Sequence, residues 1–364
     1  MEKKTCERCY LNEDYPGISF NDKGICNFCE RAMSSEYQDD INSRASVKNI
    51  EGLSKIAEEI KAVSNSKNAK YDCVIGASGG FDSTYVIYIV KKLMGLNPLV
   101  IKYDNGLCHE LANENIKETC RILDVDLRFI SVIKSERDYM VNATKSLESL
   151  GVFFSACFSC HYILPSLVYK TAREENISYT FSSTNIIEDE ADAGSHGFKV
   201  KALIKGFFTS NPKQMLKIIY YQILAQIDFV KLKFQIDGFS MAFLRNLPTP
   251  YPVSPKWLKK VNVSEYIGWD YLAIMKKMQE DLNWKSPAAS KVPLFRWDCY
   301  YGALTDKSCQ KTVGIGAHAA LCNWFVQTGI VSKQDVAEEM KYLEDKQRIQ
   351  EEIDIVYKKF GLQD

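Results

Sequence analysis

The chain has no excess of either charge, because 46 lysines and arginines balance 46 aspartates and glutamates over 364 residues. Proteins that bind long nucleic acids usually carry a strongly basic surface, so this balance disfavours a large RNA substrate while leaving room for a local basic patch. Histidine is scarce as well, with 4 residues. Three of these, His109, His196 and His318, have no partner at a catalytic or metal-ligand spacing, and we expect them to be structural.

A long, uninterrupted apolar run is also missing. The most apolar stretch, Met215 to Phe234, contains three lysines and an aspartate, so it does not fit a membrane span. We interpret it as a helix that packs on a core or on a partner. Its content of isoleucine, tyrosine, phenylalanine and lysine is also compatible with a helix that lies on a membrane surface.

The first residues, Met1 to Lys4, lead into a cysteine pair without the apolar segment of a signal peptide. In a chain without such a leader, the 12 cysteines are expected to be thiols and metal ligands rather than disulfides. We therefore expect a cytoplasmic protein.

Four of the cysteines are spaced as ligands of one metal ion. Cys6, Cys9, Cys26 and Cys29 form the pattern C-x2-C-x16-C-x2-C, which suits four thiolates around a tetrahedral Zn²⁺. The segment between the pairs has turn residues and little apolar content, so a bound metal would have to stabilise its fold. We predict a structural zinc knuckle over residues 1–34. Iron fits the same geometry, and four free thiols in a flexible leader are the alternative.

The stretch from Gly76 to Ser83 reads G-A-S-G-G-F-D-S and stands between an apolar run and a helical pattern. Its adjacent glycines allow a sharp turn and a close approach of a ligand to the backbone. Serine hydroxyls, turn amides and the positive end of the next helix then converge on one point, which suits a phosphate chain. The lysine of a Walker A loop is missing. The pattern instead resembles the PP-loop of the N-type ATP pyrophosphatases, which implies that ATP contacts Ala77, Ser78, Gly79, Gly80, Asp82 and Ser83.

Strand and helix patterns alternate around this loop. Four short apolar runs indicate strands near residues 72–76, 98–103, 127–132 and 178–182. With helical patterns between them, they predict an α/β fold, a parallel sheet with helices on both faces. We assign residues 35–195 to this ATP-binding domain and residues 196–364 to a mainly helical region that binds the substrate or a partner.

Ligands of parallel sheets bind at the carboxyl ends of the strands, which points to two further segments. Lys102 and Asp104 stand at the end of the second strand, where PP-loop proteins place the adenosine, so both are candidate nucleotide contacts. Asn185 follows the fourth strand and leads into three acidic residues that could hold Mg²⁺ through oxygen ligands. The same residues are equally typical of a helix start, with a capping side chain and acids in the first turn.

A second C-x-x-C pair, Cys157 and Cys160, has no obvious second pair. With the lone Cys299 it would provide three thiolates and one open position. This set resembles the iron–sulfur site of some PP-loop sulfur-transfer enzymes, where a [4Fe–4S] cluster lies beside the ATP. The alternatives are a zinc site with His161 as fourth ligand, and reduced thiols or a redox switch. Three other cysteines, which lie on strand or helix patterns, are expected to be plain core residues: Cys73, Cys108 and Cys120.

The order of these motifs is similar to that of the N-acetyl sugar amidotransferase family, a branch of the PP-loop superfamily, and the similarity covers nearly the whole chain. The resemblance implies an enzyme of bacterial surface-polysaccharide or lipopolysaccharide biosynthesis. Using ATP and Mg²⁺, it would adenylate an acetamido group of a nucleotide-linked or nonulosonic-acid precursor sugar. Ammonia would then replace the oxygen to give an acetamidino group, with release of AMP and pyrophosphate. On this resemblance Asp82, Ser78 and Lys102 are the expected catalytic residues.

The source of the ammonia is not visible in this chain. Glu2 stands where an amino-terminal-nucleophile glutaminase needs cysteine, and no G-x-C-x-G elbow is present. We expect a separate glutaminase subunit, and the family implies glutaminase and cyclase-like partners. Two other functions stay open, a PP-loop tRNA thiolation enzyme with an iron–sulfur cluster and a non-catalytic zinc-knuckle scaffold. The balanced charge and the lack of a carboxyl-terminal C-x-x-C pair disfavour the thiolation enzyme.

Overall fold

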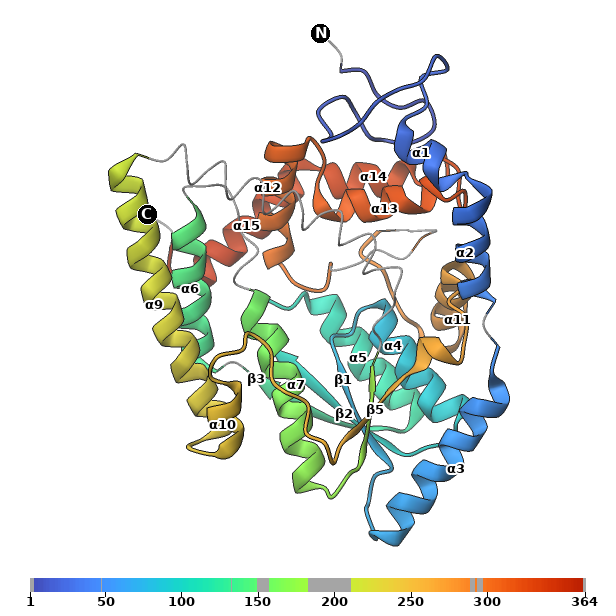
Figure 1. Ribbon diagram of the computed structural model, residues 1–364, viewed down its shortest axis with the longest axis vertical. Coiled ribbons are helices and arrows are strands. Elements are labelled where there is room, and N and C mark those ends of the chain that lie inside the picture. The colour runs from blue at the N-terminus through green and yellow to red at the C-terminus, as the bar shows by residue number, and fades with distance from the viewer. Residues whose placement is uncertain are drawn as a thin grey trace.

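A parallel sheet lies at the centre of the protein, seen here in a computed structural model (Figure 1). The structure describes residues 3–46, 48–131, 133–148, 157–182, 211–288, 292 and 297–362. Over these residues the strands are β1 (Cys73–Ala77), β2 (Pro98–Asp104), β3 (Asp126–Ser131), β4 (Tyr179–Ser182) and β5 (Lys259–Asn262). Their order is β3-β2-β1-β4-β5, and each neighbouring pair is parallel. The predicted α/β fold with a parallel sheet is confirmed.

Helices surround this sheet and make up most of the carboxyl-terminal part, as predicted. Those before residue 183 are α1 (Asn27–Ala32), α2 (Ser35–Ala45), α3 (Ile50–Ser66), α4 (Phe81–Tyr88), α5 (Glu110–Leu123), α6 (Lys134–Glu148) and α7 (Cys157–Glu174). Those after residue 210 are α9 (Pro212–Asp237), α10 (Met241–Asn246), α11 (Tyr271–Leu282), α12 (Tyr301–Val313), α13 (Ala317–Gln327), α14 (Ala337–Glu344) and α15 (Lys346–Phe360). None of the helices in the described part of the chain combines the length and apolar character that crossing a membrane requires.

Alternate side chains of β1 enter two separate cores, as the two-residue period of a strand requires. Cys73, Ile75 and Ala77 pack with buried residues of α3, α4 and α5, whereas Val74 packs with buried residues of α6 and α7. Because helices cover both faces of the sheet, the central strands β1 and β2 are buried almost throughout. The sheet takes its edge strand β5 from beyond residue 196, where it pairs with β4.

The amino-terminal segment rests on helices that are distant in sequence. Figure 1 shows α1 next to α13, and the two helices are in contact. The Tyr10 hydroxyl donates a hydrogen bond to the carbonyl of Lys333 at 2.8 Å, and the Lys333 ammonium donates to the carbonyl of Cys6 at 2.9 Å. The backbone N–H of Tyr10 also donates to the Asn323 side chain at 3.1 Å. The amino-terminal segment is therefore packed against α13 and the segment that follows it.

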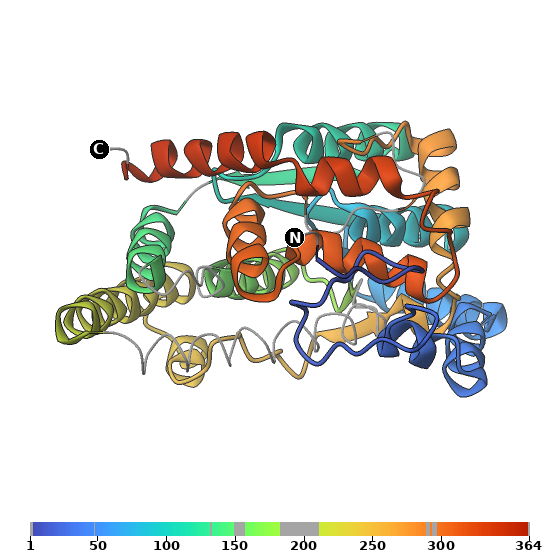
Figure 2. The same ribbon diagram turned by 90° about the horizontal axis from the view of Figure 1, so that it is seen from above.

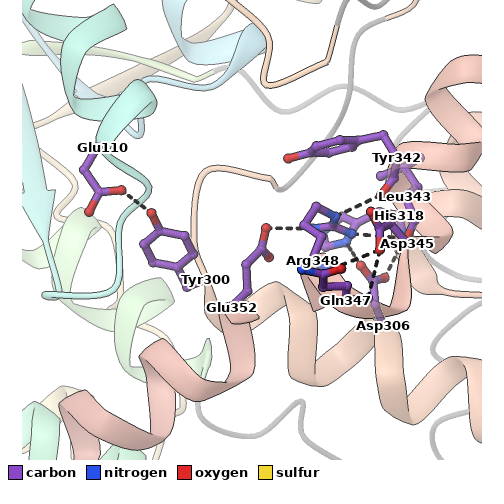
Figure 3. A network of polar contacts seen from close by, with 10 residues as sticks. All are labelled: Glu110, Tyr300, Asp306, His318, Tyr342, Leu343, Asp345, Gln347, Arg348 and Glu352. Carbon is purple, nitrogen blue, oxygen red and sulfur yellow. Dashed lines mark hydrogen bonds and ion pairs between the residues drawn. The ribbon is translucent and has the colours of Figure 1, made fainter. Parts of the chain in front are cut away.

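Polar contacts hold the carboxyl-terminal helices together (Figure 3). Buried Asp306 on α12 accepts a hydrogen bond from the backbone N–H of His318 at 2.9 Å and lies 2.5 Å from its ring Nδ1, which joins α12 to α13. The Arg348 guanidinium on α15 donates to two carbonyls at the end of α14, at 2.9 and 3.1 Å. The contacts between Asp306 and His318 hold α12 against α13, and residues 297–300, which lead into α12, belong to the site described below.

Lys233, on the inner face of α9, is 2% exposed and holds α9 and α10 together. Its ammonium donates to the carbonyls of Asn246, Leu247 and Thr249 at 2.9, 3.0 and 2.6 Å. Lys233→Met is expected to leave these carbonyls without this donor and to lower the free energy of unfolding by about 2 kcal/mol. Urea denaturation would measure the change, with exposed Lys213→Met as the control on the same helix. Equal stability of the two variants would contradict the role of Lys233.

Candidate nucleotide site and cysteine sites

The loop after β1 requires glycine at one position. Gly79 has a φ of +88°, and a Cβ built on it would lie 2.1 Å from the carbonyl oxygen of Ala112 on α5. A side chain there would be strained by its backbone conformation and would collide with a helix backbone. The Trp284 indole N–H also donates to the Gly79 carbonyl at 3.4 Å. The loop is therefore packed tightly against α5 and against the segment after α11.

Hydroxyls and amides of the loop lie close together. The Ser78 hydroxyl accepts from the backbone N–H of Gly80 at 3.2 Å and lies 3.4 Å from the Ser83 hydroxyl. Ser83 in turn accepts from the backbone N–H of Ser78 at 3.3 Å. No side chain caps the amino end of α4 at Gly80. Because the first amides of a helix have no partner within the helix, this end of α4 suits an anionic ligand.

Lys102 places a positive charge directly under the loop. It lies on β2 opposite Ala77 and is 1% exposed. Its ammonium donates to the carbonyl of Ser78 at 2.6 Å. A buried cation is expensive unless it is paired, so a negative ligand in the loop would stabilise it as well as be stabilised by it.

The acidic candidates are held by neighbours. Asp82, in the first turn of α4, accepts a hydrogen bond from the Trp269 indole N–H at 2.9 Å. Asp104 accepts from the backbone N–H of Gly106 at 2.8 Å and from the Asn113 side chain at 3.2 Å. Asp104 thus closes the turn after β2 and connects it to α5. Asn185 and the acidic residues that follow it lie outside the described residues.

The four amino-terminal cysteines form a set sized for one metal ion. Their sulfur atoms all lie within 4.8 Å of one another and are buried. Two of the spacings are 3.9 Å, between Cys6 and Cys29, and 3.8 Å, between Cys9 and Cys26. Four thiolates around a tetrahedral ion at about 2.3 Å would be about 3.8 Å apart. The cysteines can therefore hold a tetrahedral metal ion with little rearrangement.

Backbone amides support these sulfurs. The N–H of Cys26 donates to the Cys6 sulfur at 3.2 Å, and the N–H of Cys29 donates to the Cys26 sulfur at 3.4 Å. Such bonds stabilise thiolate charge, which metal binding requires. The cysteines also belong to the same buried cluster as residues of α13, so a metal here would hold the amino-terminal segment on the carboxyl-terminal helices.

Two cysteines of the second set meet at Asn105, in the turn after β2. The Asn105 amide nitrogen lies 3.2 Å from the Cys160 sulfur and 3.8 Å from the Cys299 sulfur, so the structure brings these two cysteines together. Cys157 and Cys160 lie in the first turn of α7. Among the described residues, no set with the tight one-ion spacing includes these three cysteines. A cluster of several metal and sulfide atoms spans more widely separated thiolates than a single zinc ion does.

Cys108 lies beside this set and had been expected in a plain core position. It is partly buried and pairs with Cys299 in an isolated antiparallel bridge. Its sulfur lies 3.6 Å from the Asn105 side-chain oxygen and accepts from the Lys102 ammonium at 3.4 Å. The position of Cys108 just after the end of β2 could have indicated that it lies beside this set, because the carboxyl ends of adjacent parallel strands share one edge of the sheet.

Burial governs the ionisation of these thiols. It raises the pKa of Cys160 and of Cys299 well above that of a free thiol, and the nearby Glu136 carboxylate raises the pKa of Cys160 further. It also raises the pKa of Cys108 to about 11, against the opposing effect of Lys102. A bound metal cation would favour the thiolates instead.

A short segment before α12 carries Cys299 to this position. The backbone N–H of His109 donates to the carbonyl of Asp298, and that of Tyr300 donates to the carbonyl of Leu107, both at 2.9 Å. The Tyr300 hydroxyl also donates to the Glu110 carboxylate at the start of α5 (Figure 3). The carboxyl-terminal region therefore forms one wall of the site at the carboxyl ends of β1 and β2.

No family model matches this chain. An uncharacterized protein of Methanocaldococcus jannaschii is 28% identical over 131 residues, which are 36% of this chain and 44% of that protein. The matched part thus spans less than half the length of this curated relative.

Three solved structures show a distant likeness. The U34-tRNA thiolase of Methanococcus maripaludis, solved with its [4Fe–4S] cluster, has 13% identity and a TM-score of 0.32 over 91% of this chain and 89% of that one. The NH3-dependent NAD synthetase of Campylobacter jejuni has 17% identity and a TM-score of 0.29, over 49% of this chain and 96% of that one. The NMN synthetase of Francisella tularensis also has 17% identity and a TM-score of 0.29, over 57% of this chain and 98% of that one.

Proposed function

We propose that the protein is an ATP-dependent enzyme of the PP-loop type that activates a carbonyl oxygen by adenylation. The observation that carries this proposal is the loop at Ser78–Ser83, packed over the buried ammonium of Lys102 at the carboxyl end of β1. Turn amides, two hydroxyls and a helix start meet one buried cation there, which is the chemistry that a polyphosphate chain requires. ATP would bind by its terminal phosphates and present its α-phosphate to the acceptor.

The acceptor that we propose is the acetamido group of a precursor sugar for a bacterial surface polysaccharide. The amide oxygen attacks the α-phosphorus and pyrophosphate leaves, which yields an O-adenylated imidate. Ammonia then adds to the imidate carbon, and AMP leaves with the original oxygen to give an acetamidine. Adenylation is needed because the oxygen of an amide is a poor leaving group. Lys102 and the loop amides would stabilise charge on the departing pyrophosphate.

The metal sites would have separate roles. Zn²⁺ held by the four amino-terminal cysteines would be structural, because four protein ligands leave no open position. Mg²⁺ would neutralise phosphate charge during the transfer. An iron–sulfur cluster would be held by Cys157, Cys160 and Cys299, with Asn105 donating to two of the sulfurs. Ammonia would come from a separate glutaminase subunit.

Release of AMP and pyrophosphate tests this function. We expect it to depend on both an acetamido sugar nucleotide and ammonia, with an acetamidino product detected by mass spectrometry. Asp82→Ala is expected to lower the rate of AMP release about a hundredfold, since it removes the carboxylate that lies in the first turn of α4, at the end of the loop. Glu51→Ala, at an exposed position on α3, is the control. Unchanged product formation by Asp82→Ala would remove the catalytic assignment and favour a scaffold protein.

A tRNA thiolase is the second candidate, because Cys160 and Cys299 meet beside the nucleotide loop. The balanced charge of the chain disfavours a tRNA substrate. AMP release that requires bulk tRNA and a sulfur donor, and does not respond to sugar plus ammonia, would favour this candidate. Absorption near roughly 400 nm in anaerobically purified protein would establish an iron–sulfur cluster without deciding between the two reactions.

A further inference from the structure

Exposed large apolar side chains are concentrated in one segment of the protein. Of the 18 such residues in the described chain, 14 lie between Leu216 and Trp257, on α9, α10 and the loop that follows them. Soluble surfaces seldom expose apolar groups in one contiguous patch, and such patches mark sites of contact with a partner or a membrane. The adenylation chemistry proposed above uses none of these residues.

The apolar residues on α9 form a single stripe. Seven of them are at least 42% exposed, among them Leu216, Ile223, Ile227 and Phe234. At 100° per residue they fall within an arc of about 100° on this 26-residue helix. The opposite face of α9 is already used, because buried residues such as Phe229 pack with those of α6 and α7. Figures 1 and 2 both show α9 at the edge of the molecule, with α6 next to it.

The charge of this segment is one-sided. Residues 211–260 contain 8 lysines and arginines but 2 acids, in a chain whose total charge is zero. Of the two acids, Asp228 is buried and Asp237 is half-buried, so each fully exposed charged side chain in the segment is cationic. Lys213 and Lys231 lie at one margin of the stripe by the same helical geometry, and the Lys231 ammonium also pairs with the Asp228 carboxylate at 2.8 Å. A basic margin beside an apolar stripe is typical of helices that lie in the interface of an anionic membrane.

The segment after α9 extends this surface. Phe239 and Met241, at the turn into α10, are 82% and 79% exposed. Tyr251 and Trp257, farther along, are 50% and 40% exposed. Aromatic side chains of this kind are enriched at the level of lipid headgroups.

We propose that α9, α10 and the loop to Trp257 form a docking face for an anionic phospholipid surface. The apolar stripe would enter the boundary between headgroups and acyl chains, and the lysines would lie against lipid phosphates. A second copy of the same face would bring cations against cations with no fully exposed acid to pair them, which disfavours a homodimer. The protein would bind the membrane from one side.

Flotation of the full-length protein with vesicles tests this proposal. We expect binding to phosphatidylcholine vesicles that contain roughly one third phosphatidylglycerol, and binding at least about tenfold weaker to phosphatidylcholine alone. Raising the salt concentration should weaken the binding. Ile223→Glu combined with Ile227→Glu should weaken it at least about tenfold, because charges would enter the apolar boundary.

A matched control is Leu93→Glu, since Leu93 is 54% exposed outside the patch and Ile223 is 55% exposed within it. It should bind vesicles like the wild type, and circular dichroism should show that both variants are folded. Failure of the wild-type protein to bind anionic vesicles would overturn the proposal. So would equal losses in the two variants, or a wild-type dimer that dissociates when Ile223 and Ile227 are changed. None of these results bears on the release of AMP, so failure here is distinct from failure of the proposed function.

Discussion

Gly79→Ala is expected to lower AMP formation at least about a thousandfold while the rest of the fold is kept. The φ of +88° at Gly79 is unfavourable for alanine, and the new Cβ would lie 2.1 Å from the Ala112 carbonyl oxygen. Neither the loop nor α5 can yield without moving backbone, so the amides around Ser78 and Gly80 would be displaced. Pyrophosphate release from ATP measures the effect, and thermal unfolding measures the accompanying loss of stability.

Gly361→Ala separates backbone strain from collision. Gly361 has a φ of +67°, and nothing lies within 4 Å of a Cβ built there. We expect this variant to lose about 1 kcal/mol of stability at most and to keep full activity. If Gly79→Ala were as active as Gly361→Ala, the tight packing of the loop against α5 would have no part in ATP use.

Cys9→Ser is expected to abolish metal binding at the amino-terminal knuckle and to lower the free energy of unfolding by about 4 kcal/mol or more. Removal of one of four thiolates leaves an incomplete tetrahedral site, and the segment has little apolar core of its own. Because the Lys333 ammonium and the Tyr10 hydroxyl connect this segment to the region after α13, the loss should extend to the carboxyl-terminal helices. Elemental analysis and urea denaturation provide the two readouts.

The control for this variant is Cys120→Ser. Cys120 is buried on α5 and lies outside the four-cysteine set, so the change buries a hydroxyl without removing a ligand. The free energy of unfolding of Cys120→Ser should fall by roughly 1 to 2 kcal/mol, and its metal content should be that of the wild type. A chelator should destabilise Cys120→Ser and leave Cys9→Ser unchanged. Equal metal content in both variants would exclude the knuckle as a metal site.

Features that depend on residues close in sequence were predictable. The turn between β1 and α4 follows from two adjacent glycines after an apolar run, and Gly79 has the positive φ that only glycine adopts easily. The grouping of the four amino-terminal cysteines follows from two tight C-x-x-C turns. The order of strands and helices through residue 182 follows from apolar periodicity, because each period reports on one element alone.

Features that depend on distant contacts were harder to predict. The edge strand β5 is short, with exposed lysines, and becomes a strand through its pairing with β4. Cys108 looked like a core residue in the sequence. The turn after β2, which contains Asn105, places it beside Lys102. Cys299 could be named as a candidate ligand, but its distance from Cys160 could not be derived from spacing.

The sequence by itself determined the glycine turn after β1, the grouping of the four amino-terminal cysteines and the parallel α/β core. Glycine geometry, ligand spacing and side-chain periodicity are local properties. Packing alone placed Lys102 under Ser78, gathered Cys108, Cys160 and Cys299 around Asn105, and left one stripe of α9 uncovered. The reason is that contacts between residues far apart in a chain depend on how whole elements fit together. No local pattern records that fit.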